Sequence, residues 1–158
     1  MSKNATKASD NVFYRARSAA SKYNDRLGSR EGASEELGID RTRLARIELG
    51  SLAPYPEEIL LMAEIYNAPE LKPLYCREMC PLGKDMPKVE IETLDRITVK
   101  ALSVFKKIAS VKEDLLDIVE DGVVSDDERP ELERIMETLD EVVQVSQNLR
   151  IWIEKNLK

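Results

Sequence analysis

Apolar residues in the first half of the chain recur at spacings of three and four positions. This period is typical of short amphipathic helices that bury one face. The expected helices cover residues 12–23, 30–37, 41–49, a segment that begins at Pro56, and residues 70–79. The residues expected to be buried are Val12, Ala16, Ala19, Ala20 and Tyr23 in the first helix, and Ile59, Leu60, Met62, Ala63 and Tyr66 in the fourth.

Capping residues mark the ends of the second and third helices. Ser29 and Asp40 have side-chain oxygens that can accept hydrogen bonds from the free N–H groups at a helix start. Gly38 and Gly50 suit the backbone turn that ends a helix. We therefore expect two short helices joined by a tight turn. Gly32 should weaken the first of them by about 1 kcal/mol relative to alanine.

The pattern changes after a linker over residues 81–89, which contains proline and glycine. Beyond it the apolar residues follow a heptad repeat, which predicts two long helices packed along one seam. The seam residues are Leu94, Ile97, Ala101, Val104, Ile108, Val111, Leu115 and Ile118 in the first arm, and Leu132, Ile135, Leu139, Val142, Ser146, Leu149 and Ile153 in the second. We expect an antiparallel helical hairpin over residues 90–158, with a first arm from Lys88 to Asp121 of roughly 50 Å.

A second apolar stripe lies beside the predicted seam. Its members are Phe105, Val119, Met136, Val143 and Trp152. Two helices alone bury little surface, so a hairpin with two stripes needs further cover. Two arrangements remain open. The favoured one is a homodimer formed through residues 90–158, and the other packs the hairpin on the N-terminal domain of its own chain. For Trp152, packing is favoured over a ligand-binding role.

Composition supports an all-α protein with two modules. Aromatic residues make up only 5% of the chain, which suits helices better than sheets. The expected organisation is a flexible arm (residues 1–11), a five-helix domain (12–80), the linker (81–89) and the hairpin (90–158). No apolar run is long enough to span a bilayer, and residues 1–11 lack the apolar core of a secretion signal. We therefore expect a cytoplasmic protein without membrane contact.

The residue types present argue against catalysis. The sequence contains no histidine, which removes the commonest general base and metal ligand. Cys76 and Cys80 are the only cysteines, too few for a structural zinc site with four ligands. We expect them to pack as small apolar side chains, with a redox or metal role shared with a second chain as the alternative. Neither an enzymatic activity nor a metal or cofactor is expected.

Charge is divided unevenly along the chain. Residues 1–87 hold 13 basic and 13 acidic side chains, whereas residues 88–158 hold 11 and 17. Within residues 1–30 there are 7 basic and 2 acidic side chains. Positive charge is therefore concentrated near the N-terminus, as expected when one module faces nucleic acid and the other faces protein or water.

The helix over residues 41–49 has the pattern of a DNA-reading helix. Leu44 and Ile47 lie on one side and should point to the core, while Thr42, Ala45 and Arg46 lie on the exposed side. An arginine there can form two hydrogen bonds with guanine, and an alanine or threonine methyl can contact thymine. Arg41 occupies the first turn, which enters the groove most deeply. Arg43, on the flank, is better placed for a phosphate.

Residues 37–50 resemble the helix-turn-helix family of the Cro and lambda-repressor type, also called the xenobiotic-response-element family. The resemblance rests on the turn Leu37–Asp40, the core pair Leu44 and Ile47, and the exit Ile47–Gly50, with Ala63 and Tyr66 matching the next helix. It extends over about residues 12–80 and implies a five-helix DNA-binding domain that acts as a dimer on an operator. By position it implies a phosphate contact for Arg30 and base-reading roles for Arg41, Thr42, Ala45 and Arg46.

The sequence thus predicts a DNA-binding transcriptional regulator, with repression as the expected mode and double-stranded DNA as the partner. The alternative is a protein-interaction module, such as an antitoxin or a mobile-element accessory protein, whose hairpin binds another protein.

Overall fold

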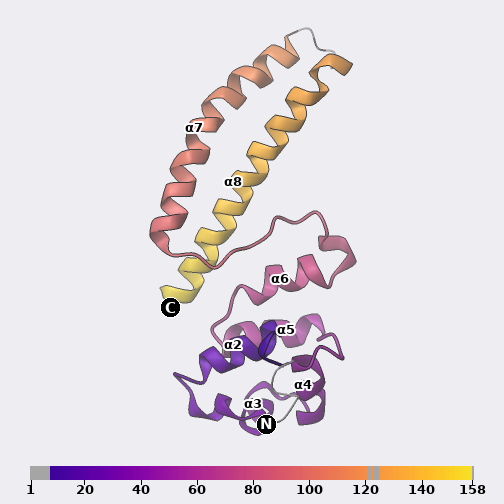
Figure 1. Cartoon of the computed structure of the whole chain (residues 1–158), viewed down its shortest axis with the longest axis vertical. Coiled ribbons are helices and arrows are strands. Elements are labelled where there is room, and N and C mark those ends of the chain that lie inside the picture. The colour runs from indigo at the N-terminus through magenta and orange to yellow at the C-terminus, as the bar shows by residue number, and fades with distance from the viewer. Residues whose placement is uncertain (1–7, 121, 123–124, 158) are drawn as a thin grey trace. The chain divides into compact units, whose positions relative to one another are not determined.

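The computed structural model describes residues 8–120, 122 and 125–157. All regular structure within these residues is helical, which confirms the all-α expectation (Figure 1). The α-helices are α2 (Val12–Ala20), α3 (Arg30–Leu37), α4 (Arg41–Glu48), α5 (Pro56–Ile65), α6 (Leu71–Glu78), α7 (Leu94–Val119) and α8 (Arg129–Asn156). Three short 3₁₀ segments complete the secondary structure: η1 (Asp25–Gly28), η2 (Pro81–Gly83) and η3 (Asp126–Glu128). None of the helices described is both long enough and apolar enough to cross a membrane.

The chain divides into two compact units, residues 1–86 and residues 87–158. The boundary between them falls inside the expected linker, residues 81–89. Part of that linker is helical, because η2 follows α6 directly and packs against it.

Helices α2 to α6 enclose the core of the first unit. Its largest fully buried apolar side chains are Phe13, Leu27, Leu44, Ile47, Met62 and Leu71. Three of the side chains expected to be buried are exposed. Helix α2 ends at Ala20, so Tyr23 lies beyond it and is 93% exposed, and Ala19 is exposed as well. Leu60 is 60% exposed, because α5 turns Ile59 and Met62 to the core instead.

The expected flexible arm is partly tied to the domain. Residues 1–7 of the arm lie outside the described residues. Ala8 is buried, and the side chain of Asn11 accepts a hydrogen bond from the N–H of Phe13 (2.9 Å), which caps α2. The amide of Asn11 also donates to the backbone oxygen of Ile47 (3.0 Å), so this residue connects the start of α2 to the end of α4.

Gly32 allows α3 to approach η1 closely. A β-carbon at this position would lie 2.2 Å from the backbone oxygen of Arg26, a distance no real contact has. The sequence-based view of Gly32 as a weak point of the helix is therefore wrong: glycine is the residue that fits, since any side chain would push η1 away. By contrast, nothing lies within 4 Å of a β-carbon at Gly28.

Helices α7 and α8 form the second unit and run antiparallel, side by side (Figure 1). On α7 the buried residues are the predicted seam positions Ile97, Val104, Val111 and Ile118, one every seven residues. On α8 the seam is right at Ile135, but toward its end Asn148 and Ile151 are buried in place of Leu149 and Ile153. Ser146 is exposed as well. The segment before α7 covers this side of α8, because Asn148 bonds to the N–H of Glu90 and to the side chain of Glu92.

The first arm is shorter than predicted. Helix α7 begins at Leu94 and has 26 residues, about 39 Å, whereas a start at Lys88 was expected. The segment before it packs on α8 instead. Gln144 donates from Nε2 to the backbone oxygen of Lys88 (2.9 Å), and Asn148 accepts from the N–H of Glu90 (3.2 Å). These bonds use backbone groups that a longer α7 would need for itself.

Replacement of Gly32 by alanine should destabilise the first unit by about 1–3 kcal/mol, because the new methyl group collides with the backbone of Arg26. Helix propensity alone predicts the opposite sign. Urea unfolding followed by circular dichroism measures the effect. Gly28→Ala is the matched control and should change the free energy of unfolding by less than about 0.5 kcal/mol. A stabilised Gly32→Ala protein would contradict the close approach.

Candidate nucleic-acid interface

Helices α3 and α4 are joined by a turn whose backbone bonds are satisfied locally. Ser29 accepts from the N–H of Gly32 (3.0 Å) and so caps α3. Gly38 ends that helix with φ +65°, and the N–H of Ile39 bonds back to the backbone oxygen of Ser34 (3.1 Å). Asp40 then caps α4 through the N–H of Arg43 (2.9 Å). The capping residues expected from the sequence therefore fix where α4 begins.

Helix α4 has one buried face and one open face. Leu44, Ile47 and Glu48 are buried, with the two apolar side chains fully enclosed. Arg41, Thr42 and Arg46 are exposed and Ala45 is half-buried. At 100° per residue Thr42, Ala45 and Arg46 lie within about a third of a turn of one another, with Arg41 beside Ala45. The open face is thus small and carries two guanidinium groups.

No described residue forms a hydrogen bond or ion pair with the guanidinium of Arg41 or of Arg46. Both side chains extend from a helix whose two ends are held, by Asp40 at the start and by Asn11 at the end. A fixed helix with unpaired cations on its open face can accept an anion without first breaking a contact within the protein.

Arg43 is engaged by the protein itself. It donates from Nε and Nη2 to the two carboxylate oxygens of Glu58 (2.5 and 2.8 Å), and its guanidinium lies 4.0 Å from the ring centre of Tyr55. The hydrogen bond with Arg43 lowers the pKa of Glu58, and the same bond raises the pKa of Arg43. Glu58 also accepts from the N–H of Tyr55 (2.7 Å), which closes the start of α5.

A buried carboxylate connects α4 to α2 and α3. Glu48 is completely buried and accepts from Nε and Nη2 of Arg17 (2.5 and 3.1 Å) and from Nε of Arg30 (2.7 Å). Arg17 also donates to the backbone oxygen of Leu27 (2.8 Å). Burial would lower the pKa of Arg17, but the hydrogen bond with Glu48 and the charge of that carboxylate raise it overall. The bridge fixes the C-terminal end of α4.

The structure therefore separates the six predicted DNA-contacting residues into two groups. Arg41, Thr42, Ala45 and Arg46 share the open face of α4. Arg30 and Arg43 each bond to a carboxylate of the same domain. Sequence reasoning did not find Arg17, Glu48 and Glu58, the three residues that complete these pairs. Charged residues on a nominally apolar helix face were the available signal, since such residues are buried only when paired.

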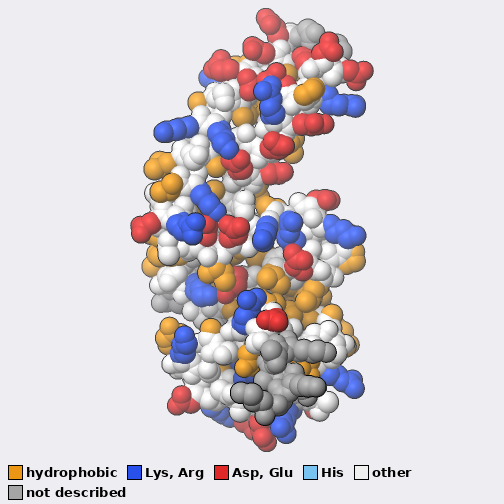
Figure 2. All heavy atoms as spheres, viewed as in Figure 1, with side chains coloured by type: hydrophobic (Ala, Val, Ile, Leu, Met, Phe, Trp, Pro, Cys, Tyr) orange, Lys and Arg blue, Asp and Glu red, His pale blue; other side chains and the backbone are white. Residues whose placement is uncertain are grey.

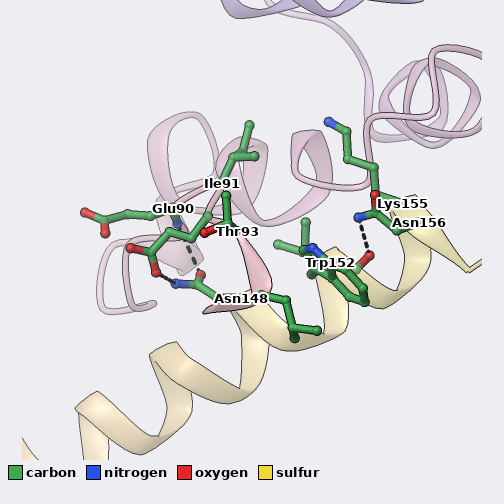
Figure 3. Close-up of a pocket in the computed structure, with 10 residues that line it drawn as sticks. Glu90, Ile91, Thr93, Asn148, Trp152, Lys155 and Asn156 are labelled. Carbon is green, nitrogen blue, oxygen red and sulfur yellow. Dashed lines mark hydrogen bonds between the residues drawn. The ribbon is translucent and has the colours of Figure 1, made fainter. Parts of the chain in front are cut away.

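The second unit contains a cavity of about 500 Å³ between the segment before α7 and the last turns of α8 (Figure 3). The indole of Trp152 lines it, together with Ile91, Leu94 and Ile151. Asn148, 2% exposed, donates to Glu92 (3.3 Å) while it accepts from the backbone of Glu90. Its polar groups are thus occupied in holding this segment on α8.

The carboxylates beside this cavity are paired as well. Lys100 lies 2.7 Å from Glu92 and 3.0 Å from Glu90. Its hydrogen bond with Glu92, followed by that with Glu90, raises the pKa of Lys100, and the bond with Lys100 lowers the pKa of Glu90. Cys76 and Cys80 are free thiols and half-buried. Over the described part of the chain, no group of three or more His, Cys, Asp or Glu residues is arranged to hold a metal ion.

Comparison with known proteins gives no relative to reason from: no family model matches the chain, and no curated protein or solved structure is detectably similar to it.

Replacing Arg17 with methionine should cost about 3 kcal/mol of stability, because the buried carboxylate of Glu48 then loses its strongest partner. Methionine keeps most of the side-chain volume. Chemical denaturation at pH 7 measures the loss. Arg15→Met, an exposed arginine on the same helix, is the control and should cost less than about 0.5 kcal/mol. Equal losses in the two variants would show that the buried bridge contributes nothing.

Glu58→Gln should remove the part of the pH dependence of stability that arises from the ion pair between Glu58 and Arg43. The pKa of Glu58 is lowered in the folded protein, so the ionised pair stabilises fully above the pKa of the unfolded carboxyl, about 4.3. This contribution is lost as the pH falls through the lowered folded value. The variant should therefore be less stable than the wild type at pH 7, with the difference shrinking below about pH 4.

Urea titrations between pH 7 and pH 3 test this expectation. Glu57→Gln, an exposed neighbour in the same helix turn, serves as the control and should show no such convergence. A constant difference between Glu58→Gln and the wild type across this range would mean that the ion pair does not stabilise the fold.

Proposed function

We propose that this protein is a sequence-specific DNA-binding transcriptional regulator in which α3 and α4 act as a helix-turn-helix and α4 enters the major groove. The observation that carries the proposal is the open face of α4, where Arg41, Thr42, Ala45 and Arg46 stand on a helix fixed at both ends. The two arginines are unpaired among the described residues. Repression, by occupying a site that the transcription machinery needs, is the expected mode.

The proposal assigns different tasks to the six residues expected from the sequence. Arg41 and Arg46 read bases through paired hydrogen bonds with guanine, and Thr42 and Ala45 provide methyl contacts. Arg30 and Arg43 mainly orient the domain, because their guanidinium groups are bonded to Glu48 and Glu58. Fewer arginines are therefore assigned to reading bases than the number around α4 suggests.

The proposed regulator acts as a homodimer through residues 90–158. Reading helices on two copies related by a two-fold axis would contact two half-sites on a symmetric operator. Selection of bound duplexes from a random DNA library tests both points at once, because it reveals the site and its symmetry.

The competing proposal is a protein-interaction module, such as an antitoxin or a mobile-element accessory protein. The exposed apolar residues of α7 and α8 support it, since such residues can also bind a different protein. The two proposals differ in salt dependence. A regulator should bind its selected site tightly, with an affinity that falls steeply as salt rises. A module with only secondary DNA contact should select no consensus sequence.

Arg46→Ala should reduce the preference for one base pair in each half-site by about 1–3 kcal/mol, because two hydrogen bonds to a base are lost. Competition binding with duplexes altered at single positions measures the change. Lys22→Ala, which also removes one positive charge but lies beyond the end of α2, should leave the preference unchanged. If Arg46→Ala weakens binding equally on all sequences, then Arg46 contacts only phosphate.

A further inference from the structure

The α7–α8 pair carries a stripe of exposed apolar side chains that its own packing does not use. On α7 the residues that directly follow the buried Val104 and Ile118 are Phe105 and Val119, each 61% exposed. Leu102 and Leu116, 57% and 54% exposed, extend this line. The stripe is therefore displaced from the buried seam of α7 by about 100°, the rotation of one residue.

Helix α8 repeats this arrangement. Met136 follows the buried Ile135 and is 55% exposed, and Val143 follows the half-buried Val142 and is 44% exposed. Leu149 and Ile153, two predicted seam residues that the structure leaves exposed, lie about 100° or more around the helix from Met136 and are not part of this line.

The two lines lie on the same side of the pair. In antiparallel helices that face each other, an equal rotation in the sequence direction moves both faces to one side. Along these lines the described parts of α7 and α8 also contribute charged side chains, Asp95 and Lys112 on α7 and Glu133, Asp140, Arg150 and Glu154 on α8. Figure 2 shows one side of the pair, where Lys, Arg, Asp and Glu side chains gather over both helices. We call the apolar side chains of these lines, Leu102, Phe105, Leu116, Val119, Met136 and Val143, the outer stripe.

The outer stripe is large relative to what the pair buries. Its six side chains expose on the order of 600 Å², somewhat less than the share of one partner in a standard interface and at the upper end of the largest apolar patches of most monomers. The pair itself fully buries six aliphatic side chains along its seam, Ile97, Val104, Val111, Ile118, Ile135 and Ile151. Two helices with so small a core need a further covering surface.

We infer that the outer stripe is covered by the outer stripe of a second copy, so that the two α7–α8 pairs form a four-helix dimer core. A two-fold interface joins a patch to itself, so the patch must be self-complementary. The outer stripe meets this condition because both helices contribute apolar side chains to it and the charged residues along it are of both signs. Two such stripes together also reach the area of a specific interface. A second copy of the chain is available wherever the protein is made, so it can cover these apolar side chains at all times.

This inference deepens the proposed function, on which its connection to DNA rests, by naming the surface through which the two copies meet. The interface lies on the outer stripe and not on the heptad seam that the sequence suggests. Phe105 and Val143 lie near the middle of their helices, close to the level of the Lys107–Glu141 ion pair. They are therefore central to the interface, where a charge costs most.

Sedimentation of the full chain without DNA tests the inference. The wild type should be a dimer at micromolar concentration, and Phe105→Glu with Val143→Glu should weaken association at least 100-fold. Ser110→Glu is the control, because it adds a negative charge one residue before the buried Val111, on the opposite side of α7, and should leave the dimer intact. A monomeric wild type, or equal weakening by the control, overturns the inference.

A mixing experiment separates lost association from lost folding. A chain with Glu at positions 105 and 143 and a chain with Lys at both positions should each be monomeric alone. Mixed in equal amounts they should form a heterodimer, because opposite charges now meet at the centre of the interface. Failure of the mixture to associate, or a wild type that stays monomeric because its own N-terminal unit covers the stripe, overturns the inference. Since no DNA is present, these results are independent of whether α4 reads bases.

Discussion

The fully buried carboxylate of Glu48 is the constraint on which the geometry of the first unit depends. It lies at the C-terminal end of α4 and is bonded to Arg17 on α2 and Arg30 on α3. Removing a charge from water is costly, and the cost is offset only if partners are held in good geometry. The three helices must therefore keep their relative positions for the carboxylate to remain paired. Asn11 adds a second link at the same end of α4, through the backbone of Ile47.

This arrangement explains how so small a domain can present a rigid open face. Helix α4 has eight residues and would not be stable alone. Its apolar side chains supply the burial, its caps fix the start, and the buried bridge fixes the end. What remains outside is a short surface whose arginines need no rearrangement before they meet an anion. The proposal of DNA reading rests on this surface alone.

The helices of the first unit could be predicted because their signals are local. Ser29, Gly38 and Asp40 act within a few residues of the chain, so the ends of α3 and α4 are readable from the sequence. The partners of Arg30 and Arg43 could not be read in this way, because they lie 18 and 15 residues away in sequence. The requirement for glycine at position 32 is also non-local, since it depends on the backbone of η1.

In the second unit the periodic pattern located both helices but not their final rotation. Near the end of α8 the buried face includes Asn148, because the segment before α7 packs on it. The late start of α7 depends on Gln144 and Asn148, which are more than 50 residues away from the segment they hold. A heptad count alone contains no information on such contacts.

The internal pairing of Arg30 and Arg43 has a consequence for the salt dependence of the proposed DNA binding. Cations condensed on a duplex are released only by protein charges that replace them, and the salt dependence of binding counts those charges. Arg30 and Arg43 already carry protein carboxylates as counterions, so a duplex gains little from them. The response to salt should then reflect fewer phosphate contacts than the arginines around α4 suggest. Contacts with bases would accordingly contribute a larger share of the affinity than electrostatic attraction to phosphates.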